Sequence, residues 1–266
     1  MRSAQLHGRN TEEIGTIDAV AEGPAAIALS RGGSAKRYEH VDPNEDSCAF
    51  AIGDGGVLIA VADGHHGEFG ARLAIEYVSQ TLAPVVCSRE APASDGAGWA
   101  DCLYGALREI SRQILDYASA RQVPPAPTTL ALAVVRQHEG YWAWAGAGDS
   151  HAFRVREDEA EDVVMRSARK YFLGSREESW HRKATALGAE PLAATRSIVL
   201  ATDGLSEAGI GVEDPAALVQ RTVKAAQGIE PGRRTQWLAR EIAEQANASH
   251  HRQRSGDNIA AAAIGP

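Results

Sequence analysis

Short apolar runs, separated by polar turns, recur along most of the chain and predict buried β-strands. Two of them, Val57–Ala62 and Ser197–Ala201, are rich in β-branched and small apolar residues and are followed closely by Asp-Gly. The same pattern predicts strands at Ala25–Leu29, Cys48–Ile52, Val57–Ala62, Thr129–Arg136, Tyr141–Ala147, His151–Arg156, Ser197–Ala201 and Asn258–Ile264.

Other stretches repeat apolar residues at a spacing of three to four and predict amphipathic helices. These helices are expected at Glu68–Val86, Trp99–Ala120, Pro215–Ala226 and Arg233–Ala248. The helices come in pairs between groups of strands rather than alternating with single strands. This order indicates an α+β fold of largely antiparallel sheets covered by helices.

Several predicted strands end or begin beside an Asp that is followed by Gly, Ser or Asn. These segments are Val61-Ala-Asp63-Gly-His-His66, Gly148-Asp149-Ser150, Ala201-Thr-Asp203-Gly-Leu-Ser-Glu207 and Gly256-Asp257-Asn258. Carboxylates on converging strand ends would suit Mg²⁺ or Mn²⁺, whereas zinc would favour His and Cys at close spacing. A single Asp-Gly is more often a turn, and Gly53-Asp-Gly-Gly56 between two strands is predicted to be one.

The composition narrows the classes of function. The chain has 266 residues, no Pro/Gly/Ser-rich linker and a net charge of −8, which opposes binding to a nucleic-acid backbone. We therefore expect a single domain over residues 1–266, with about the first 20 residues forming a flexible N-terminal extension. Cys48, Cys87 and Cys102 form no CxxC pair, which favours free thiols over disulfides or a thiolate zinc site. Neither a leader peptide nor a membrane span is evident, so we expect a cytoplasmic protein.

With these motifs in this order, the chain resembles the metal-dependent protein phosphatases of type 2C from about Ala25 to Ile264. The motifs are Asn44-Glu-Asp46, Val61-Ala-Asp-Gly-His-His-Gly67, Thr128-Thr129, Gly146-Ala-Gly-Asp-Ser-His-Ala152, Leu200-Ala-Thr-Asp-Gly-Leu-Ser-Glu207 and Gly256-Asp-Asn-Ile259. The resemblance implies a four-layer α-β-β-α sandwich of two antiparallel sheets flanked by helix pairs. That architecture agrees with the order of elements predicted from periodicity.

The resemblance also implies a centre of two Mg²⁺ or Mn²⁺ ions, with a third, weaker ion beside them. Asp63 would bridge the two ions, and the carbonyl of Gly64 would complete one coordination sphere. Asp203 and Asp257 would hold the second ion.

Further residues follow from the same resemblance. Glu45 and Asp46 would act largely through metal-bound water, and Asp149 would form the third ion site with Asp203 and Glu207. Asn258 would support the Asp257 loop by hydrogen bonding.

The implied reaction is hydrolysis of phosphoserine and phosphothreonine monoesters in proteins by a metal-bridging hydroxide. His65 matches the general acid that protonates the leaving oxygen. His66 competes for this role, but adjacent side chains on extended backbone point in opposite directions, so we favour His65. The chain has no Cys-x5-Arg loop, nucleophile elbow or P-loop that would support another mechanism.

Two departures from the family pattern concern substrate binding. The family commonly places a phosphate-binding Arg four residues before Glu45, where this chain has Val41. Arg31, Lys36 or Arg37 could replace it, although each is by default a solvated surface residue. After His151–Arg156, about fifteen residues precede Phe172-Leu-Gly174, which matches the turn after the family's flap and predicts a short flap.

The departures leave two alternatives open: a non-catalytic or weakly catalytic regulator of the same fold that binds a partner protein, and a small-molecule phosphomonoesterase. We favour the protein phosphatase, acting as a monomer on a phosphorylated protein and opposing a serine/threonine kinase, with neither nucleic acid nor membrane as a partner.

Structural roles are expected for the remaining His and Trp residues. His151 at a strand end is expected to bond to backbone, and His250-His251 is expected in a solvated turn. Trp142 and Trp144 alternate on one strand, which favours packing in the core over an aromatic binding cage.

Overall fold

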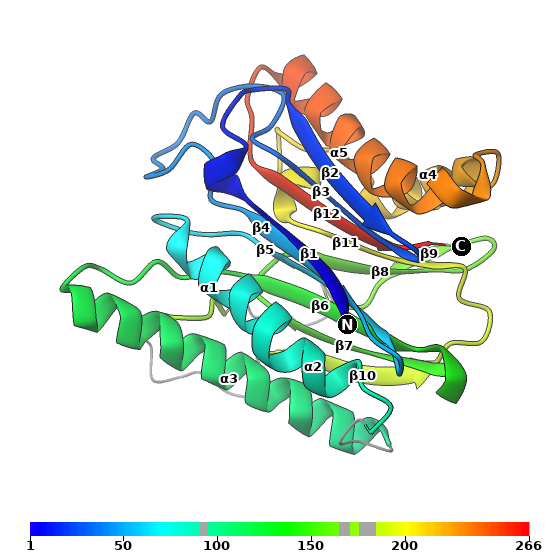
Figure 1. The fold of residues 1–266 in the computed structure, drawn as a ribbon. Coiled ribbons are helices and arrows are strands. Elements are labelled where there is room, and N and C mark those ends of the chain that lie inside the picture. The colour runs from blue at the N-terminus through cyan, green and yellow to red at the C-terminus, as the bar shows by residue number, and fades with distance from the viewer. Residues whose placement is uncertain (91–94, 165–170, 176–184, 266) are drawn as a thin grey trace.

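The structure, a computed structural model, describes residues 1–90, 95–164, 171–175 and 185–265. Two antiparallel sheets, each of six strands, pack face to face, and helices cover both outer faces (Figure 1). The chain therefore has the expected α+β sandwich.

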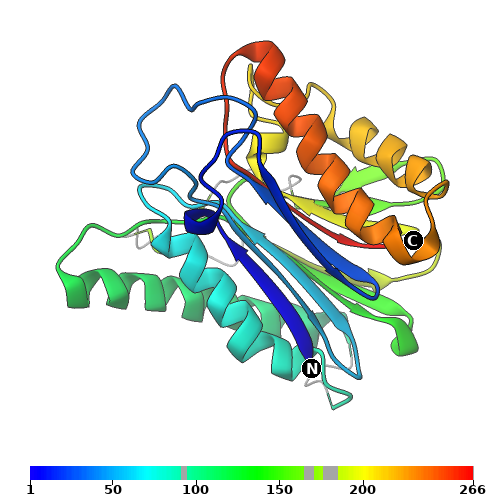
Figure 2. The ribbon, with the colours of Figure 1, turned by 45° about the horizontal axis from the view of Figure 1, so that its top comes forward.

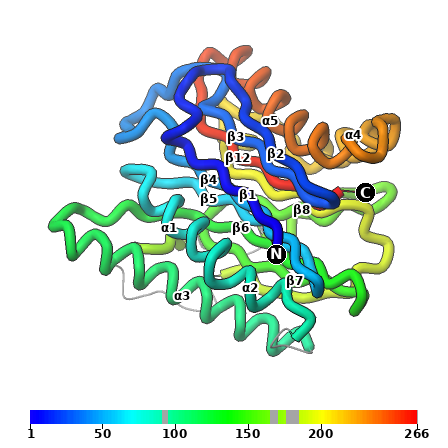
Figure 3. Tube along the Cα trace, viewed as in Figure 1, coloured from blue at the N-terminus to red at the C-terminus, as the bar shows by residue number. Residues whose placement is uncertain are grey.

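Each sheet draws its strands from both halves of the chain. The first sheet has the order β1 (Arg2–His7), β4 (Ser47–Ile52), β5 (Val57–Ala62), β6 (Leu130–Arg136), β7 (Tyr141–Ala147) and β10 (Ala186–Pro191). The second has the order β2 (Ile17–Glu22), β3 (Ala25–Ser30), β12 (Ile259–Ile264), β11 (Ser197–Ala201), β8 (His151–Val155) and β9 (Ala160–Asp162). The Cα trace shows the first and last strands of the chain, β1 and β12, in different sheets (Figure 3).

The helices divide between the two outer faces. The first sheet is covered by α1 (Phe69–Tyr77), which continues through a π-helical turn (Val78–Leu82) into α2 (Ala83–Val86), and by α3 (Gly96–Arg121). The second sheet is covered by α4 (Pro215–Ala226) and α5 (Arg234–Gln253), as the turned view also shows (Figure 2). Among the described residues, no helix is both long and apolar enough to cross a membrane.

The core has three layers, and the period of two along the strands assigns side chains to them. In β5, Leu58 and Ala60 pack against α1–α3, whereas Ile59 and Val61 face the opposite sheet. Trp142 and Trp144 belong to the layer between the sheets, so the prediction of core packing is confirmed.

The predicted helices and strands are all present, with ends that shift by a few residues. The expected flexible extension is wrong, because the first 20 residues contain β1 and the start of β2. β1 pairs with β4 along its whole length, and Ala4 and Leu6 pack against the layer between the sheets. These contacts fix the N-terminal segment in the first sheet.

Candidate active site at the common edge of the sheets

The acidic motifs lie where strands of both sheets end or begin. Asp63 follows β5 and Asp203 lies just after β11, whereas Asp46 precedes β4 and Asp257 lies just before β12. β4 pairs with β5 and β11 pairs with β12, both antiparallel. The end of one strand therefore lies beside the start of the next, which brings the four carboxylates to one edge of the sandwich.

The backbone of Asp63 is held by hydrogen bonds from the start of β6. Its N–H donates to Thr129 Oγ1 at 2.9 Å, and its carbonyl accepts from Thr128 Oγ1 at 2.7 Å and from the Thr129 N–H at 2.9 Å. Ser150 Oγ lies 2.7 Å from Thr129 Oγ1 and extends this network towards Asp149. The Thr128-Thr129 pair thus positions the Asp63 side chain.

The glycine after each strand-end Asp allows a close backbone approach. A Cβ on Gly64 would lie 2.7 Å from the carbonyl oxygen of Glu45, and one on Gly204 would lie 1.8 Å from that of Asn258. No larger residue fits without moving the backbone. These two glycines pack the carboxylate-bearing turns together.

Glu45 anchors its own loop. Its Oε1 accepts from the backbone N–H groups of Gly67 at 2.6 Å, Val41 at 3.2 Å and Asp42 at 3.3 Å. The Glu45 N–H donates to Asn258 Oδ1 at 2.9 Å. The loop before β4 is therefore joined to the turn after β5 and to the start of β12.

Asn258 also joins the loop that follows β3 to the loop before β4. Its Nδ2 donates to the carbonyls of Arg31 at 3.0 Å and Pro43 at 3.1 Å, and its N–H donates to Asp257 Oδ1 at 2.7 Å. It holds the Asp257 turn against the loop that follows β3.

Burial and mutual repulsion control the charge of the carboxylates. Burial raises the pKa of Asp63 well above its usual value, and the charges of Asp203, Asp46 and Asp257 raise it further. Burial and the charge of Asp257 likewise raise the pKa of Asp203. Burial raises the pKa of Asp46 to about 7, although a hydrogen bond from Thr202 opposes the shift.

One buried oxygen in this cluster has no hydrogen-bond partner among the described residues, namely Asp46 Oδ1. A buried acceptor without a donor is costly unless a water or cation meets it. Several carboxylate oxygens with a net negative charge suit a hard divalent ion, so the residues present fit the Mg²⁺ or Mn²⁺ expected from the sequence.

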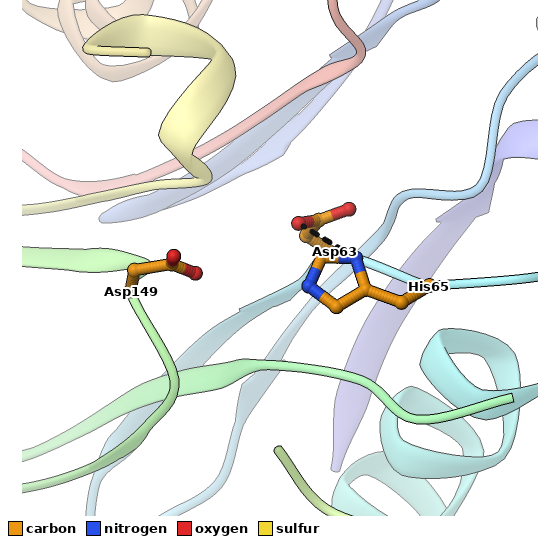
Figure 4. A group of neighbouring side chains, drawn as sticks. All are labelled: Asp63, His65 and Asp149. Carbon is orange, nitrogen blue, oxygen red and sulfur yellow. Dashed lines mark ion pairs between the residues drawn. The ribbon is translucent and has the colours of Figure 1, made fainter. Parts of the chain in front are cut away.

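Asp63, His65 and Asp149 form a group of donor side chains that could hold a metal ion (Figure 4). One donor atom from each lies within 4.8 Å of the others, and His65 Nδ1 lies 3.7 Å from Asp63 Oδ2. In the described part of the chain, this group does not include Asp203. Asp149 and Glu207 do lie near enough to Asp203 for their charges to help raise its pKa. Nothing else tests the third ion site of Asp149, Asp203 and Glu207, which stays a prediction.

A cavity of about 500 Å³ opens above the carboxylates. Its walls are formed by Lys36, Tyr38, Glu39, Glu45, Asp63, Gly64, His65, His66, Pro127, Phe172, Asp203, Glu207 and Asp257. Both histidines reach it, but the extended backbone assumed from the sequence is wrong, because His66 has a φ of 65°. The ring of His65 packs edge-on against Phe172 at 4.4 Å between centroids, and burial lowers the pKa of His65.

The segment of Phe172 forms the turn predicted from the sequence, because the Ser175 N–H donates to the Phe172 carbonyl at 3.3 Å and Gly174 has a φ of 79°. Leu173 pairs with Thr128 through two backbone hydrogen bonds of 2.8 and 2.9 Å, which places Phe172 over the cavity. The next strand, β10, begins only at Ala186. The interval between β8 and Phe172 includes residues 165–170, which lie outside the described residues, so the short flap stays a prediction.

Lys36 is one of the three basic residues that the sequence offered as a replacement for the missing Arg, and the structure places it in the site. Its side chain is only 4% exposed, and its Nζ lies 3.4 Å from Asp257 Oδ1 and 3.6 Å from Glu45 Oε2. Tyr38 donates a hydrogen bond to the same Asp257 oxygen. The expectation that Lys36 is a solvated surface residue is wrong, because its loop folds over the carboxylates. Val41 is 66% exposed and is not part of the cavity wall.

Two other histidines differ from expectation. His151 bonds to side chains rather than backbone, with Nδ1 2.6 Å from Asp162 Oδ2 and Nε2 2.6 Å from Ser206 Oγ. His250 is fully buried in the last turn of α5, where its Nε2 lies 2.7 Å from the Gly204 carbonyl oxygen. It supports the turn that carries Asp203 and is not part of a solvated turn.

Paired sheets with helices outside define a two-sheet α+β protein, and the acidic cluster at their common edge could hold a metal ion. A sequence profile described as Protein phosphatase 2C matches residues 13–243, and the chain belongs to this family. No curated protein matches the chain significantly.

Solved structures share the fold at low sequence identity. The serine/threonine phosphatase Stp1 from Staphylococcus aureus is 16% identical, with a TM-score of 0.62 over 98% of this chain and 99% of its own. The catalytic domain of the serine/threonine protein phosphatase PstP, in complex with two manganese ions, is 19% identical, with a TM-score of 0.62 over 93% and 98%. A serine-threonine phosphatase 2C from Toxoplasma gondii is 16% identical, with a TM-score of 0.65 over 98% of both chains.

Proposed function

We propose that this protein is an Mg²⁺- or Mn²⁺-dependent phosphatase that hydrolyses phosphoserine and phosphothreonine monoesters in other proteins. The observation that carries the proposal is a set of buried carboxylates, with raised pKa values and one unsatisfied oxygen, at the floor of an open cavity. Membership of the protein phosphatase 2C family supports it. The manganese complex of PstP supports the choice of ion.

Asp63, Asp203 and Asp257 would hold the ions, with Glu45, Asp46, Asp149, Glu207 and the Gly64 carbonyl around them. When bound, the ions would supply an activated water and neutralise charge on the phosphoryl group.

The chain's own contribution would be positioning and proton transfer. Thr128 and Thr129 hold Asp63, and Phe172 restrains the His65 ring. Because His65 Nδ1 faces Asp63, the proton for the leaving serine or threonine oxygen would come from Nε2. The open cavity would admit a side chain presented on a protein surface.

The biological setting belongs to the same proposal. The protein would act in the cytoplasm as a monomer and oppose a serine/threonine kinase. A non-catalytic regulator is the alternative, and one observation favours it: Lys36 already places a positive charge among the carboxylates.

Substitution of the ligands tests the proposal. Asp63→Asn and Asp203→Asn keep the side-chain shape but remove the charge that would hold the ions. Loss of a residue that only supports a metal ligand costs about 10–100-fold, so each change should lower Mn²⁺-dependent hydrolysis of para-nitrophenyl phosphate by more than about 100-fold.

Asp54→Asn is a matched control, because Asp54 also precedes a glycine but lies exposed in the turn between β4 and β5. It should retain full activity. Unchanged turnover by Asp63→Asn, with the fold intact by circular dichroism, would contradict the proposed centre.

A further inference from the structure

We propose that Lys36 is a built-in counter-cation, which neutralises the Glu45–Asp257 side of the acidic centre and weakens the binding of a divalent ion there. This inference rests on the proposed function, since it concerns the same ions. It assigns to Lys36 a part in setting metal affinity rather than in contacting substrate.

The Lys36 ammonium lies buried beside two of the carboxylates. Nζ lies 3.4 Å from Asp257 Oδ1 and 3.6 Å from Glu45 Oε2, and the side chain is 4% exposed. The ammonium also lies 5.3 Å from the centre of the Tyr38 ring, whose electrons favour a cation. Lys36 is therefore held inside the centre and does not extend into solvent.

The carboxylates on this side are already engaged by protein donors. Glu45 Oε1 accepts three backbone N–H groups, and its Oε2 faces Lys36. Asp257 Oδ1 accepts from the Tyr38 hydroxyl and from the Asn258 N–H, besides pairing with Lys36. The donor group of Asp63, His65 and Asp149 includes neither Glu45 nor Asp257.

Electrostatic repulsion then links Lys36 to the ions. A divalent ion held by Asp257 would lie within a few ångströms of the ammonium, where like charges in a poorly solvated site repel strongly. The ion must displace the lysine or bind more weakly beside it. Without metal, the same ammonium offsets the mutual repulsion of Asp257, Asp46, Asp63 and Glu45.

Metal titration separates this role from others. Mn²⁺ binding to the metal-free full chain would be measured by calorimetry, and free Mn²⁺ by electron paramagnetic resonance, for the wild type, Lys36→Met, Lys36→Arg and Arg37→Met. Met has a similar length to Lys but neither charge nor an oxygen ligand, so Lys36→Met should tighten the weakest Mn²⁺ site by about 10-fold or more.

The other variants serve as controls. Lys36→Arg keeps the charge and should bind Mn²⁺ as weakly as the wild type. Arg37 is exposed and lines a different hollow, so Arg37→Met should change nothing. In EDTA, Lys36→Met should melt at a lower temperature than Arg37→Met, because only the first loses an internal neutralising charge.

Each contrary result has a distinct meaning. Equal Mn²⁺ affinity in the wild type and Lys36→Met would overturn the role of Lys36 and leave the metal centre intact. The same result with a raised KM for phosphopeptide would assign Lys36 to the substrate phosphate instead. Failure of both proteins to bind Mn²⁺ would refute the proposed function itself, and the inference with it.

Discussion

Individual carboxylates at this site are buried where water cannot solvate their charge. Asp46 is 1% exposed, and its Oδ2 accepts a hydrogen bond from the Thr202 hydroxyl. Its raised pKa means that the folded protein holds a proton there at pH values where the unfolded chain has released it. The ionised site is therefore costly without a bound cation.

Asp46→Asn should consequently make the metal-free protein more stable than the wild type, and this difference in stability should grow as the pH rises. The folded pKa of about 7 lies above the unfolded value of 3.8, so the stabilising effect of this proton is lost as pH rises through 7. The advantage of the variant should grow from about pH 4 to about pH 7 and then level off, reaching at most about 4 kcal/mol.

Melting temperatures in EDTA at several pH values would measure this. Asp54→Asn, on an exposed turn, is the control and should show no such trend. An advantage for Asp46→Asn that stays constant across the range would show that Asp46 titrates normally.

His65→Ala should slow hydrolysis of an alkyl phosphate by about 10²–10⁴-fold, the usual contribution of general acid catalysis. It should affect para-nitrophenyl phosphate much less, because that leaving group scarcely needs a proton. Steady-state kinetics on both substrates would show the difference.

His66→Ala is the matched control, since His66 also reaches the cavity but is not in the group with Asp63 and Asp149. If His66→Ala discriminates between the substrates and His65→Ala does not, the assignment is reversed. Equal losses on both substrates would assign His65 a positioning role.

Some of the individual site residues could be predicted from the sequence, and others could not. Asp63, Asp203 and Asp257 were predictable because each lies beside a strong strand signal, and antiparallel pairing gathers such ends. The burial of Lys36 and His250 was not predictable, because it depends on residues distant in the sequence: Lys36 pairs with Asp257, and His250 Nδ1 accepts from the Gly33 N–H.

The strands, too, divide into those that the sequence predicts and those that it does not. The strands predicted from apolar runs are the interior strands β3–β8, β11 and β12. The four that were missed, β1, β2, β9 and β10, are the edge strands of the two sheets. An edge strand is paired on one side only and is partly solvated, so its sequence lacks a continuous apolar run. β10, for example, contains no fully buried residue.

In the molecule as a whole, the sandwich turns distant segments into one site. Strands from both sheets end at a common edge, where their turns are joined by Asn258, Thr128 and Thr129. Sequence periodicity could indicate the layers, but the depth of the cavity and the contact between Phe172 and His65 depend on packing between segments. The proposed function therefore rests on the claim that this assembled edge binds a metal ion and uses it for hydrolysis.

Phosphate release from a phosphothreonine peptide tests that claim most directly. The full chain would be assayed with Mn²⁺, after exhaustive treatment with EDTA, and after Mn²⁺ is restored. We predict release with Mn²⁺, its loss on chelation and its recovery on restoration, because the carboxylates alone neither activate water nor neutralise phosphate. Undiminished release after chelation, or none from a chain shown to bind Mn²⁺, would contradict the account.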